Sequence, residues 1–560
     1  MTWRYRFVFI GIVFFFLLVI ARLFYWQVVR AKELSALGQA QYGTNIKISP
    51  QRGVIKTSDG FPIAANEITY LLFANPKEIK NKGEAAGIIA SILDLDIASV
   101  GANLSLDKFW VPLKSGINTE AKQKLNSLNL PGIGFDREYK RFYPEASMAS
   151  HLLGFVGKDD SGNDKGYFGL EGYYDRLLKG KEGIAMQVHD AFGRPILAKM
   201  NFASGAVDGQ NLILSIDRSI QFLVEKQLKQ GVEKYGASSG MVGVIEPKTG
   251  KILAMASFPA FDPRDYQNFE DSLYKNPFIS DLYEPGSTFK PFIMSSALDA
   301  KAVTPQTKCN ICGGPVSLSG YEIRTWNDKY FKDINMIETI QRSDNTGMVF
   351  TVQKLGLDRM LTYLSKFGIG SDTGIDLQGE VSAALKPKNE WYAVDLATTG
   401  FGQGISVTPI ELLNGIATIA NDGKRMEPHV VEAVEALDGT VVKIPPKLID
   451  TPIKAQTAKI MTEFMINAVN KGEASWARPR GYRIAGKTGT ASIPIQGHYD
   501  PDQTIASFVG FAPADNPRFA MLVIFNKPQS SIYGSETAAP VFFKIAKSIL
   551  EYYGIPPEGE

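Results

Sequence analysis

Three short elements, far apart in the chain, constrain its fold more than any other feature of the sequence. They are Ser287 with Lys290, Ser343 with Asn345, and Lys487 with Thr488, Gly489 and Thr490. The first offers a hydroxyl beside a lysine, the second a hydroxyl beside a carboxamide, and the third a cation beside a glycine. Together they are a set of parts for acyl transfer through a covalent serine ester. That chemistry requires a fold that brings all three elements into one cleft.

Each of these patterns also recurs elsewhere, so context has to separate them. Ser-x-x-Lys occurs again at Ser105 and Ser272, Ser-x-Asn at Ser161, and Lys-Thr-Gly at Lys248. Lys248 follows a proline between two predicted strands and is interpreted as part of a hairpin turn. Ser161 lies in a polar loop, and Ser105 and Ser272 are interpreted as N-capping serines followed by a surface lysine. Among these serines, Ser287 alone follows a Pro-Gly pair and begins a long apolar stretch.

The first element is predicted to begin an amphipathic helix over residues 287–300, which places Ser287 and Lys290 on one face. A serine hydroxyl is a poor nucleophile until a base removes its proton. Lysine normally stays protonated, but burial or a neighbouring cation lowers its pKa toward the range of a base. We therefore predict Ser287 as the nucleophile and Lys290 as its general base. The alternative is a helix cap followed by a surface lysine.

The second element follows a predicted helix over residues 337–341 and precedes another, so it is predicted to lie in a turn. Ser343 is predicted to relay a proton to the leaving amine. Asn345 is predicted either to hold an amide of the substrate or to orient Lys290. The alternative is a helix cap and turn, which Ser, Asp and Asn all favour.

The third element is predicted to end a strand. Lys487, Thr488 and Thr490 are candidate ligands for a substrate carboxylate. Because glycine in a strand marks the close approach of another backbone, Gly489 is predicted to contact a peptide substrate. The backbone N–H groups of Ser287 and Thr490 are predicted to form an oxyanion hole, in which one donor is typically worth roughly 3–4 kcal/mol. The alternative is a plain strand end with a surface lysine.

One segment near the N-terminus is not typical of a globular protein. Residues 7–21 are an unbroken apolar run, and residues 23–29 extend it past Arg22. A membrane-spanning helix needs roughly 20 apolar residues, so the run predicts one transmembrane helix. The alternative is a cleaved secretory signal, but bulky aromatic residues stand where a cleavage site needs small ones. Basic residues flank the run on both sides, so charge leaves the orientation open.

Charge, histidine and cysteine content narrow the functional classes. The 560 residues include 60 basic and 58 acidic side chains, whereas a nucleic-acid partner usually requires a basic excess. The four histidines are scattered, and the one Cys-x-x-Cys pair, Cys309 and Cys312, supplies only half of a zinc site. We therefore predict no nucleic-acid partner, no metal and no cofactor. The two cysteines are interpreted as a local disulfide or idle thiols, ahead of a redox role.

The length allows two or three domains, and the elements change character after a small-residue linker at 204–210. Residues before the linker mix short strands with a few helices, one of them over residues 84–93. The later part predicts helices before and after an antiparallel sheet, a layered α+β arrangement. Its predicted strands are 241–246, 252–257, 482–489, 507–513 and 518–525. The predicted domains are an anchor with a cytoplasmic stub at 1–30, a stalk and pedestal at 31–210, and the α+β domain at 211–555.

The chain resembles the class B penicillin-binding proteins, which are monofunctional D,D-transpeptidases. The resemblance covers nearly the whole chain and includes further motifs at Arg52-Gly53, Arg141 to Pro144, Gly169 to Gly172, Val207 to Asp217, and Phe401 to Pro409. One departure is Lys56-Thr57, where the family commonly has Asp-Arg. The resemblance implies an α+β transpeptidase domain, with helices flanking an antiparallel sheet, on an elongated mixed pedestal of the dimerisation type.

The resemblance also implies an activity and a setting. Ser287 would attack a peptidoglycan stem peptide ending in D-Ala-D-Ala, release D-Ala, and pass the acyl group to a neighbouring stem. β-Lactams would acylate the same serine. The enzyme is expected as a single-pass protein of the cytoplasmic (inner) membrane with a periplasmic catalytic domain. Expected partners are a SEDS-family glycan polymerase and proteins of the divisome or elongasome. Residues 508–513 and 538–542 are closer to division-type members, so a septal role is favoured over elongation.

Three other functions are weighed against this one. A β-lactam sensor of this type usually carries several membrane spans and a His-Glu-x-x-His motif, which this sequence lacks. A D,D-carboxypeptidase or β-lactamase gives the ester to water, but such hydrolases rarely need a pedestal as large as residues 45–210. An inactive scaffold is disfavoured because the reactive groups are intact.

Overall fold

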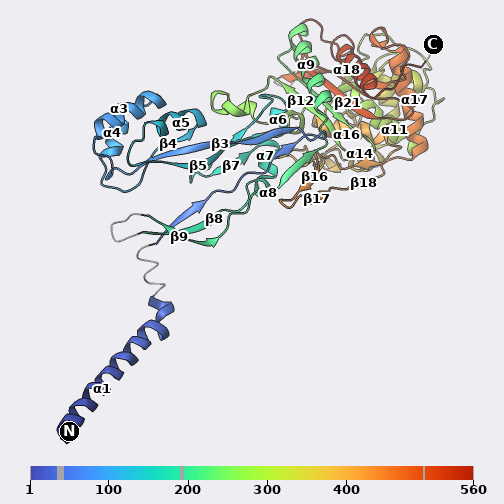
Figure 1. Cartoon of the computed structure of the whole chain (residues 1–560). Helices are drawn as coiled ribbons and strands as arrows, with labels where there is room; N and C mark the ends of the chain where they lie inside the picture. Colours follow the sequence, from blue (N-terminus) through green and yellow to red (C-terminus); the bar gives the residue numbers. More distant parts are fainter. Residues whose placement is uncertain (1, 35–42, 190–194, 496–497, 559–560) are drawn as a thin grey trace. The chain divides into compact units, whose positions relative to one another are not determined.

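Figure 1 shows the computed structural model, which describes residues 2–34, 43–189, 195–495 and 498–558. The chain forms two compact units that interleave in sequence. The N-terminal unit comprises Met1–Arg52, Asn66–Lys140 and Lys179–Gly209. The C-terminal unit comprises Gly53–Ala65, Arg141–Leu178 and Gln210–Glu560. Part of the predicted stalk, residues 35–42, lies outside the described residues.

The N-terminal unit begins with the helix predicted as the membrane span. Helix α1 (Trp3–Phe24) continues as the π-helical turn η1 (Tyr25–Val29), and none of the residues of α1 is buried. By length and composition this 27-residue helix can cross a membrane, a test that a signal sequence also passes. The Arg22 guanidinium lies 5.3 Å from the centroid of the Trp26 ring. This cation–π contact shields part of the charge that interrupts the apolar run.

The rest of the N-terminal unit contains a small sheet and a helical group. The small antiparallel sheet consists of β1 (Gly43–Ile48), β8 (Gly183–His189) and β9 (Pro195–Ser204). The other elements, which lie wholly or mostly in this unit, are β3 (Pro62–Ala74), β4 (Val111–Ile117), β5 (Ile133–Phe142), α3 (Lys82–Leu93), α4 (Ile97–Ser105) and α5 (Thr119–Ser127). Leu72, Ile89 and Leu104 are fully buried in the core of this group. The helix predicted over residues 84–93 is confirmed as part of α3.

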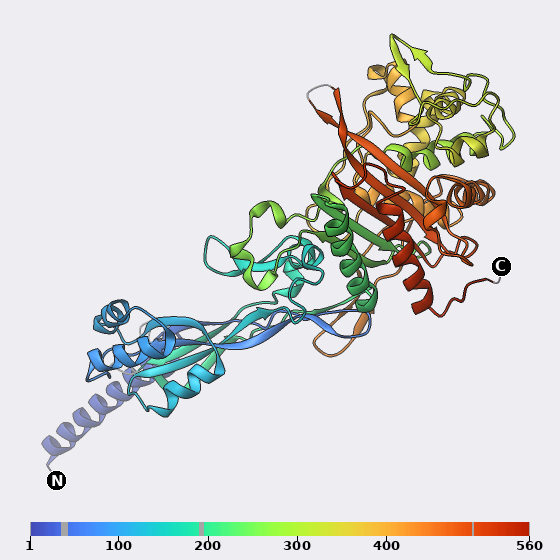
Figure 2. The ribbon, with the colours of Figure 1, turned by 90° about the horizontal axis from the view of Figure 1, so that it is seen from above.

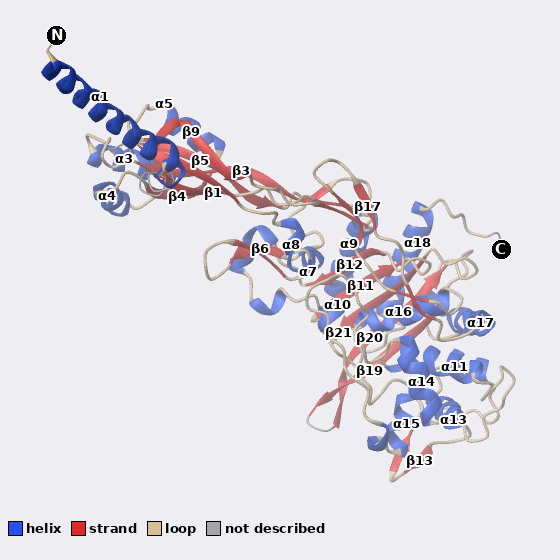
Figure 3. Cartoon of the chain, turned by 90° about the horizontal axis from the view of Figure 1, so that it is seen from below, coloured by secondary structure: helices blue, strands red, loops and turns tan. Residues whose placement is uncertain are grey.

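A five-stranded antiparallel sheet forms the centre of the C-terminal unit (Figure 3). Its order is β12 (Ile252–Phe258), β11 (Ser239–Ile245), β21 (Phe519–Asn526), β20 (His498–Ala512) and β19 (Ala485–Ile495). The predicted antiparallel sheet is confirmed, but β19 starts later and ends later than predicted. Because β19 pairs with β20 from Ala485 to Ile495, Lys487 and Thr490 lie inside this strand. The expectation that they end the strand is wrong.

The sheet is buried on both faces, because alternate side chains of each strand enter different cores. Val242 of β11 belongs to the core formed with α9 (Arg218–Tyr235) and α18 (Ala538–Tyr552). In Figure 2, α9 (green) and α18 (red) lie side by side on that face. Ile245 belongs to the core on the opposite face. Helices therefore cover the sheet on both sides, as the predicted layered α+β arrangement requires.

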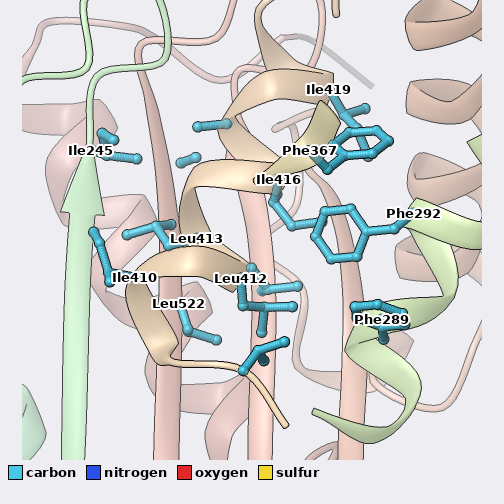
Figure 4. Packing of buried hydrophobic residues seen from close by; sticks show 14 of the residues in the cluster. Ile245, Phe289, Phe292, Phe367, Ile410, Leu412, Leu413, Ile416, Ile419 and Leu522 are labelled. Atoms are coloured by element: carbon cyan, nitrogen blue, oxygen red, sulfur yellow. The ribbon is translucent and has the colours of Figure 1, made fainter. Parts of the chain in front are cut away.

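Helix α16 (Pro409–Ala420) fills this second face and supports the helix that carries Lys290 (Figure 4). It begins with a capping box in which the side chains of Thr408 and Glu411 bond each other's backbone N–H. Its Gly415 lies against Phe292 of α11 (Lys290–Asp299), where an added Cβ would be 2.3 Å from Phe292 Cε1. Close packing on α16 thus fixes α11 against the sheet.

Short helices and strands complete the C-terminal unit. The helices are α6 (Ser150–Leu153), α7 (Gly169–Tyr173), α8 (Asp175–Leu178), α10 (Pro277–Ser280), α12 (Met336–Gln341), α13 (Asn345–Leu355), α14 (Leu357–Phe367), α15 (Ala393–Thr399) and α17 (Ala455–Lys471). The strands are β2 (Ile55–Lys56), β6 (Phe155–Lys158), β7 (Asp164–Tyr167), β10 (Asn211–Leu214), β13 (Val316–Leu318), β14 (Tyr321–Ile323), β15 (Arg425–Met426), β16 (Val431–Glu435), β17 (Val441–Lys443) and β18 (Leu448–Asp450). Cys309 and Cys312 are buried and joined in a disulfide.

The structure separates the repeated motifs from the site. Lys248 lies in the turn between β11 and β12, and Ser161 in the turn between β6 and β7, as predicted. Ser105 is the last residue of α4, and its hydroxyl donates to the Gly101 carbonyl at 2.8 Å. Interpreting Ser105 as an N-cap is therefore wrong. The N-cap of α4 is Asp96, whose carboxylate accepts from a backbone N–H of the first turn.

A buried ion pair lies within one segment of the C-terminal unit, and its arginine also bonds to a second segment. Arg141 Nε donates to Glu171 Oε1 at 2.6 Å, and their side chains are 5% and 0% exposed. Arg141 Nη1 also donates to the Gly53 carbonyl at 2.8 Å. These three residues belong to the motifs that carry the family resemblance. Lys56, at the departure from that pattern, instead pairs with Glu435 at 2.6 Å.

Candidate active site

Ser287 lies on a 3-10 turn, η4 (Gly286–Phe289), that leads into α11. Gly286 adopts a φ of +55°, and its N–H donates to the Gly402 carbonyl at 2.9 Å. The following helix is buried on all sides over residues 290–298. The prediction of an amphipathic helix beginning at Ser287 is therefore wrong. Helices α13, α14, α16 and α17 surround α11, so it has no solvent face.

The amine of Lys290 is completely buried and is held by the second element. Lys290 Nζ lies 2.6 Å from the Ser343 carbonyl oxygen, 3.2 Å from Ser343 Oγ and 2.8 Å from Asn345 Oδ1. Ser343 Oγ in turn donates to Ser287 Oγ at 2.9 Å. The hydrogen bonds thus connect Lys290 to Ser287 through one hydroxyl. Because a hydroxyl both donates and accepts, the same three heavy atoms also allow a proton to move from Ser287 toward Lys290.

The turn that carries Ser343 is fixed by the helices on either side. Ser343 adopts a φ of +55° between α12 and α13, the interhelical turn that the sequence predicts. Asp344 caps α13 by accepting from a backbone N–H at 2.9 Å. The same turn therefore caps the helix and brings the Ser343 hydroxyl to Ser287. Asn345 Nδ2 donates to the Arg324 carbonyl at 2.9 Å, while its oxygen accepts from Lys290. Both ends of this carboxamide are therefore engaged within the protein.

The third element presents its side chains from the middle of β19. Lys487 is 3% exposed, so the alternative of a surface lysine is wrong. Its Nζ donates to Thr488 Oγ1 at 3.0 Å and to the Thr488 carbonyl at 3.2 Å. Thr490 Oγ1 accepts from the backbone N–H of Gly534 at 3.1 Å. The edge strand thus places a buried cation and two hydroxyls beside η4, which packs on β19.

Two glycines allow the turn that carries Ser287 to pack closely between neighbours. A Cβ added to Gly489 would lie 2.7 Å from Thr288 Cγ2 and 2.3 Å from Ser507 Oγ. A Cβ added to Gly402, which has a φ of +81°, would lie 2.1 Å from the Gly286 carbonyl oxygen. The close neighbours of Gly489 are therefore η4 and β20. The sequence instead predicts that Gly489 contacts a peptide substrate.

Burial and like charge determine the protonation of the two lysines. Burial lowers the pKa of Lys290 well below its ordinary value, and the charge of Lys487 lowers this pKa further. The carboxylates of Asp344 and Glu473 raise it, which offsets part of the shift. Burial also lowers the pKa of Lys487, against an opposing effect of Glu473. A depressed pKa favours the neutral amine, the form in which Lys290 can accept a proton.

A cleft of about 260 Å³ brings the three elements together. It is lined by residues of all three, namely Ser287, Ser343, Asn345, Thr488 and Thr490. Trp326 and Tyr533 also line it, with ring centroids 5.8 Å apart, and so does Glu473. Sequence reasoning misses these three because each is an isolated residue in a loop. Among the described residues, no three potential metal ligands cluster.

In this fold the Ser287 hydroxyl is hydrogen-bonded, through a second serine, to a buried lysine, an arrangement that fits a serine acyltransferase. The family model for the penicillin-binding protein transpeptidase domain matches residues 240–549, and that for the penicillin-binding protein dimerisation domain matches residues 47–214. The chain belongs to the penicillin-binding protein transpeptidase family, in its class B. It is accordingly a serine-type D,D-transpeptidase.

Individual relatives span almost the whole chain. It is 33% identical to stage V sporulation protein D of Bacillus subtilis strain 168, over 99% of this chain and 86% of that protein. It is 29% identical to the peptidoglycan D,D-transpeptidase FtsI of Escherichia coli strain K12, over 100% of this chain and 93% of that protein. The crystal structure of a peptidoglycan synthetase from Bifidobacterium adolescentis superposes with a TM-score of 0.76 at 26% identity, covering 92% of this chain and 98% of that one.

Proposed function

We propose that this chain cross-links peptidoglycan stem peptides through an acyl-enzyme on Ser287, and that β-lactams acylate the same serine. The observation that carries the proposal is the hydrogen-bonded row from Lys290 through Ser343 to Ser287, with steps of 3.2 and 2.9 Å, beside one cleft. A row of this kind gives the hydroxyl proton a path to a buried amine with a lowered pKa.

The reaction proceeds in two acyl transfers. Ser287 Oγ attacks the carbonyl carbon of the penultimate D-Ala, and its proton passes through Ser343 toward Lys290. The bond to the terminal D-Ala nitrogen breaks, and that nitrogen leaves with the proton. The amine of a neighbouring stem peptide then attacks the ester carbonyl, loses a proton along the reverse path, and frees Ser287.

Substrate binding falls to the third element. The Lys487 ammonium and the hydroxyls of Thr488 and Thr490 hold the terminal carboxylate of the donor stem. The backbone N–H groups of Ser287 and Thr490 stabilise the oxyanion of the tetrahedral intermediate. The packing of η4 on β19 supports this arrangement, because it sets these two residues on one cleft.

The apolar helix and the two family models support the domain arrangement and the setting. Residues 1–30 anchor the protein in the cytoplasmic membrane, 31–210 form the stalk and pedestal, and 211–555 form the transpeptidase domain. The catalytic domain faces the periplasm. Its partners are a SEDS-family membrane glycan polymerase and proteins of the divisome or elongasome. Residues 508–513 and 538–542 favour a septal role, with elongation as the alternative.

Intact-mass spectrometry after treatment with benzylpenicillin tests the nucleophile. The wild type gains one penicilloyl adduct, which peptide mapping places on Ser287, whereas Ser287→Ala gains none. The matched control is Ser272→Ala, which removes the exposed serine of another Ser-x-x-Lys sequence and keeps full labelling. Full labelling of Ser287→Ala would discard the assigned nucleophile. To separate transfer from hydrolysis, the enzyme is given lipid-linked glycan strands, and cross-links are counted against free tetrapeptide.

A further inference from the structure

We propose that Glu473, a residue outside the three motif elements, is a positioning residue that holds Lys487 as the ammonium through the Thr488 hydroxyl. In this way Glu473 sets the pH range in which Lys290 accepts the proton of Ser287. The inference rests on the proposed function, because it concerns the acylation of Ser287. Glu473 acts through Thr488 and Lys487, and no bond formation is assigned to it.

A row of three polar groups connects Glu473 to the catalytic elements. Lys487 Nζ donates to Thr488 Oγ1 at 3.0 Å, and Thr488 Oγ1 donates to Glu473 Oε2 at 3.4 Å. In the free enzyme this hydroxyl donates its one proton to Glu473, which leaves a lone pair for the Lys487 ammonium. The second oxygen, Oε1, is buried and has no hydrogen-bond partner among the described residues.

Glu473 lies where its charge can act on the active site. It follows Gly472, which caps the end of α17, and it is the one charged side chain, among the described residues, that lines the active-site cleft. It also lines an adjacent cleft of about 250 Å³, together with the charged groups of Lys329, Arg342, Lys471 and Asp344. Asp344 is engaged as the cap of α13, and the Arg342 guanidinium lies over the Phe331 ring at 4.0 Å. Glu473 is therefore the carboxylate that acts on both buried lysines, whereas Asp344 acts on Lys290.

The sign of the effect follows from the charges. Glu473 raises the pKa of both Lys487 and Lys290, against the lowering by burial. Removing its charge lowers both values. The acid limb of the pH–rate profile for acylation, where Lys290 becomes protonated, then moves to lower pH. The alkaline limb, where Lys487 loses the charge that holds the carboxylate of penicillin, also moves to lower pH.

The test is the second-order rate of acylation of the full-length protein by benzylpenicillin, measured across acid and alkaline pH. For Glu473→Gln we expect both limbs to move to lower pH, the alkaline limb by about one unit or more, because a single hydroxyl separates Glu473 from Lys487. Glu473→Ala gives the same displacement and serves if the glutamine variant folds poorly. Glu473→Asp keeps the charge and returns the limbs toward their wild-type positions.

The matched control is Glu463→Gln, which removes a carboxylate from α17 outside the cleft, where Glu463 pairs with Arg483 at 3.0 Å and is 65% exposed. It leaves both limbs in place. A slower Glu473→Gln reaction with unmoved limbs would show a purely structural role and overturn the inference. Movement of only one limb overturns it as well, because the pKa of one of the two lysines then does not depend on Glu473. A wild type that is not acylated instead overturns the proposed function itself, so the two failures are distinguishable.

Discussion

At the scale of single residues, burial lowers the pKa of Lys290. A lysine in water has a pKa of about 10.4 and is a cation at neutral pH. Lys290 is fully buried, and Lys487 supplies a like charge nearby. Both effects favour the neutral amine. The Ser343 hydroxyl then connects this amine to Ser287 through two hydrogen bonds.

Replacing Lys290 by methionine should therefore slow acylation severely while keeping the fold. Lys290→Met preserves the volume of the buried stem but removes the proton acceptor, so we expect a loss of about 10²- to 10⁴-fold. The rate of covalent labelling by a fluorescent penicillin measures it, with circular dichroism to confirm folding. Lys248→Met, at the hairpin turn, should label like the wild type. An unchanged rate in Lys290→Met would remove Lys290 from the role of base.

At the scale of elements, the site depends on how closely η4 packs against β19. No side chain separates them at Gly489, where Thr288 and Ser507 come closest. The same turn is held from its other side by the bond from Gly286 to Gly402. The nucleophile is thus positioned by backbone contact with two elements that are distant in sequence.

Gly489→Ala tests this packing. The added methyl group meets Thr288 and Ser507, so η4 has to move away from β19. We expect a loss of about 1–3 kcal/mol in the free energy of unfolding and slower acylation, measured by denaturant unfolding and penicillin labelling. Gly314→Ala is the control, because nothing lies within 4 Å of an added Cβ there. Wild-type stability and labelling in Gly489→Ala would contradict this account of the turn.

At the scale of the whole molecule, the C-terminal unit gathers segments from three parts of the sequence. The buried pair of Arg141 and Glu171 lies within one of them, and Arg141 also bonds to Gly53 in another. Charges in such a place are expensive unless paired. The motif residues at 52–53, 141–144 and 169–172 therefore have a structural reason to be present.

Glu171→Ala should destabilise this unit strongly. It leaves the Arg141 charge buried without its carboxylate, at a cost of about 3–5 kcal/mol. The free energy of unfolding in denaturant measures the effect. Asp164→Ala breaks the exposed pair with Lys158, whose side chains are 54% and 66% exposed, and should cost about 0–1 kcal/mol. Equal effects of the two substitutions would contradict the importance of burial.

The anchor makes a separate prediction for the molecule as a whole. A variant lacking residues 1–30 loses the 27-residue apolar helix and should move from the membrane fraction to the soluble fraction after lysis. It should still be labelled by penicillin, because the site lies wholly within the C-terminal unit. Retention of the truncated protein in the membrane pellet would show that other segments anchor it.

The sequence alone determined the chemical parts and the local elements. The apolar run, the antiparallel strands and the turn at Ser343 all follow from local patterns of apolar, small and turn-forming residues. Sequence also distinguished Ser287 from the serines in similar motifs, through the Pro-Gly pair before it. These features could be predicted because they depend on neighbours a few residues away.

Only the tertiary structure decided what surrounds those parts. It placed Lys487 inside a long strand, buried α11 on every side, and put the Ser343 hydroxyl between Lys290 and Ser287. It also placed Glu473 at the cleft, which no sequence motif predicts. Burial and hydrogen bonding depend on residues that are distant in the chain, and these neighbours set the charge of each lysine. The sequence therefore identifies the candidate reacting groups, while the fold determines the hydrogen bonds between them.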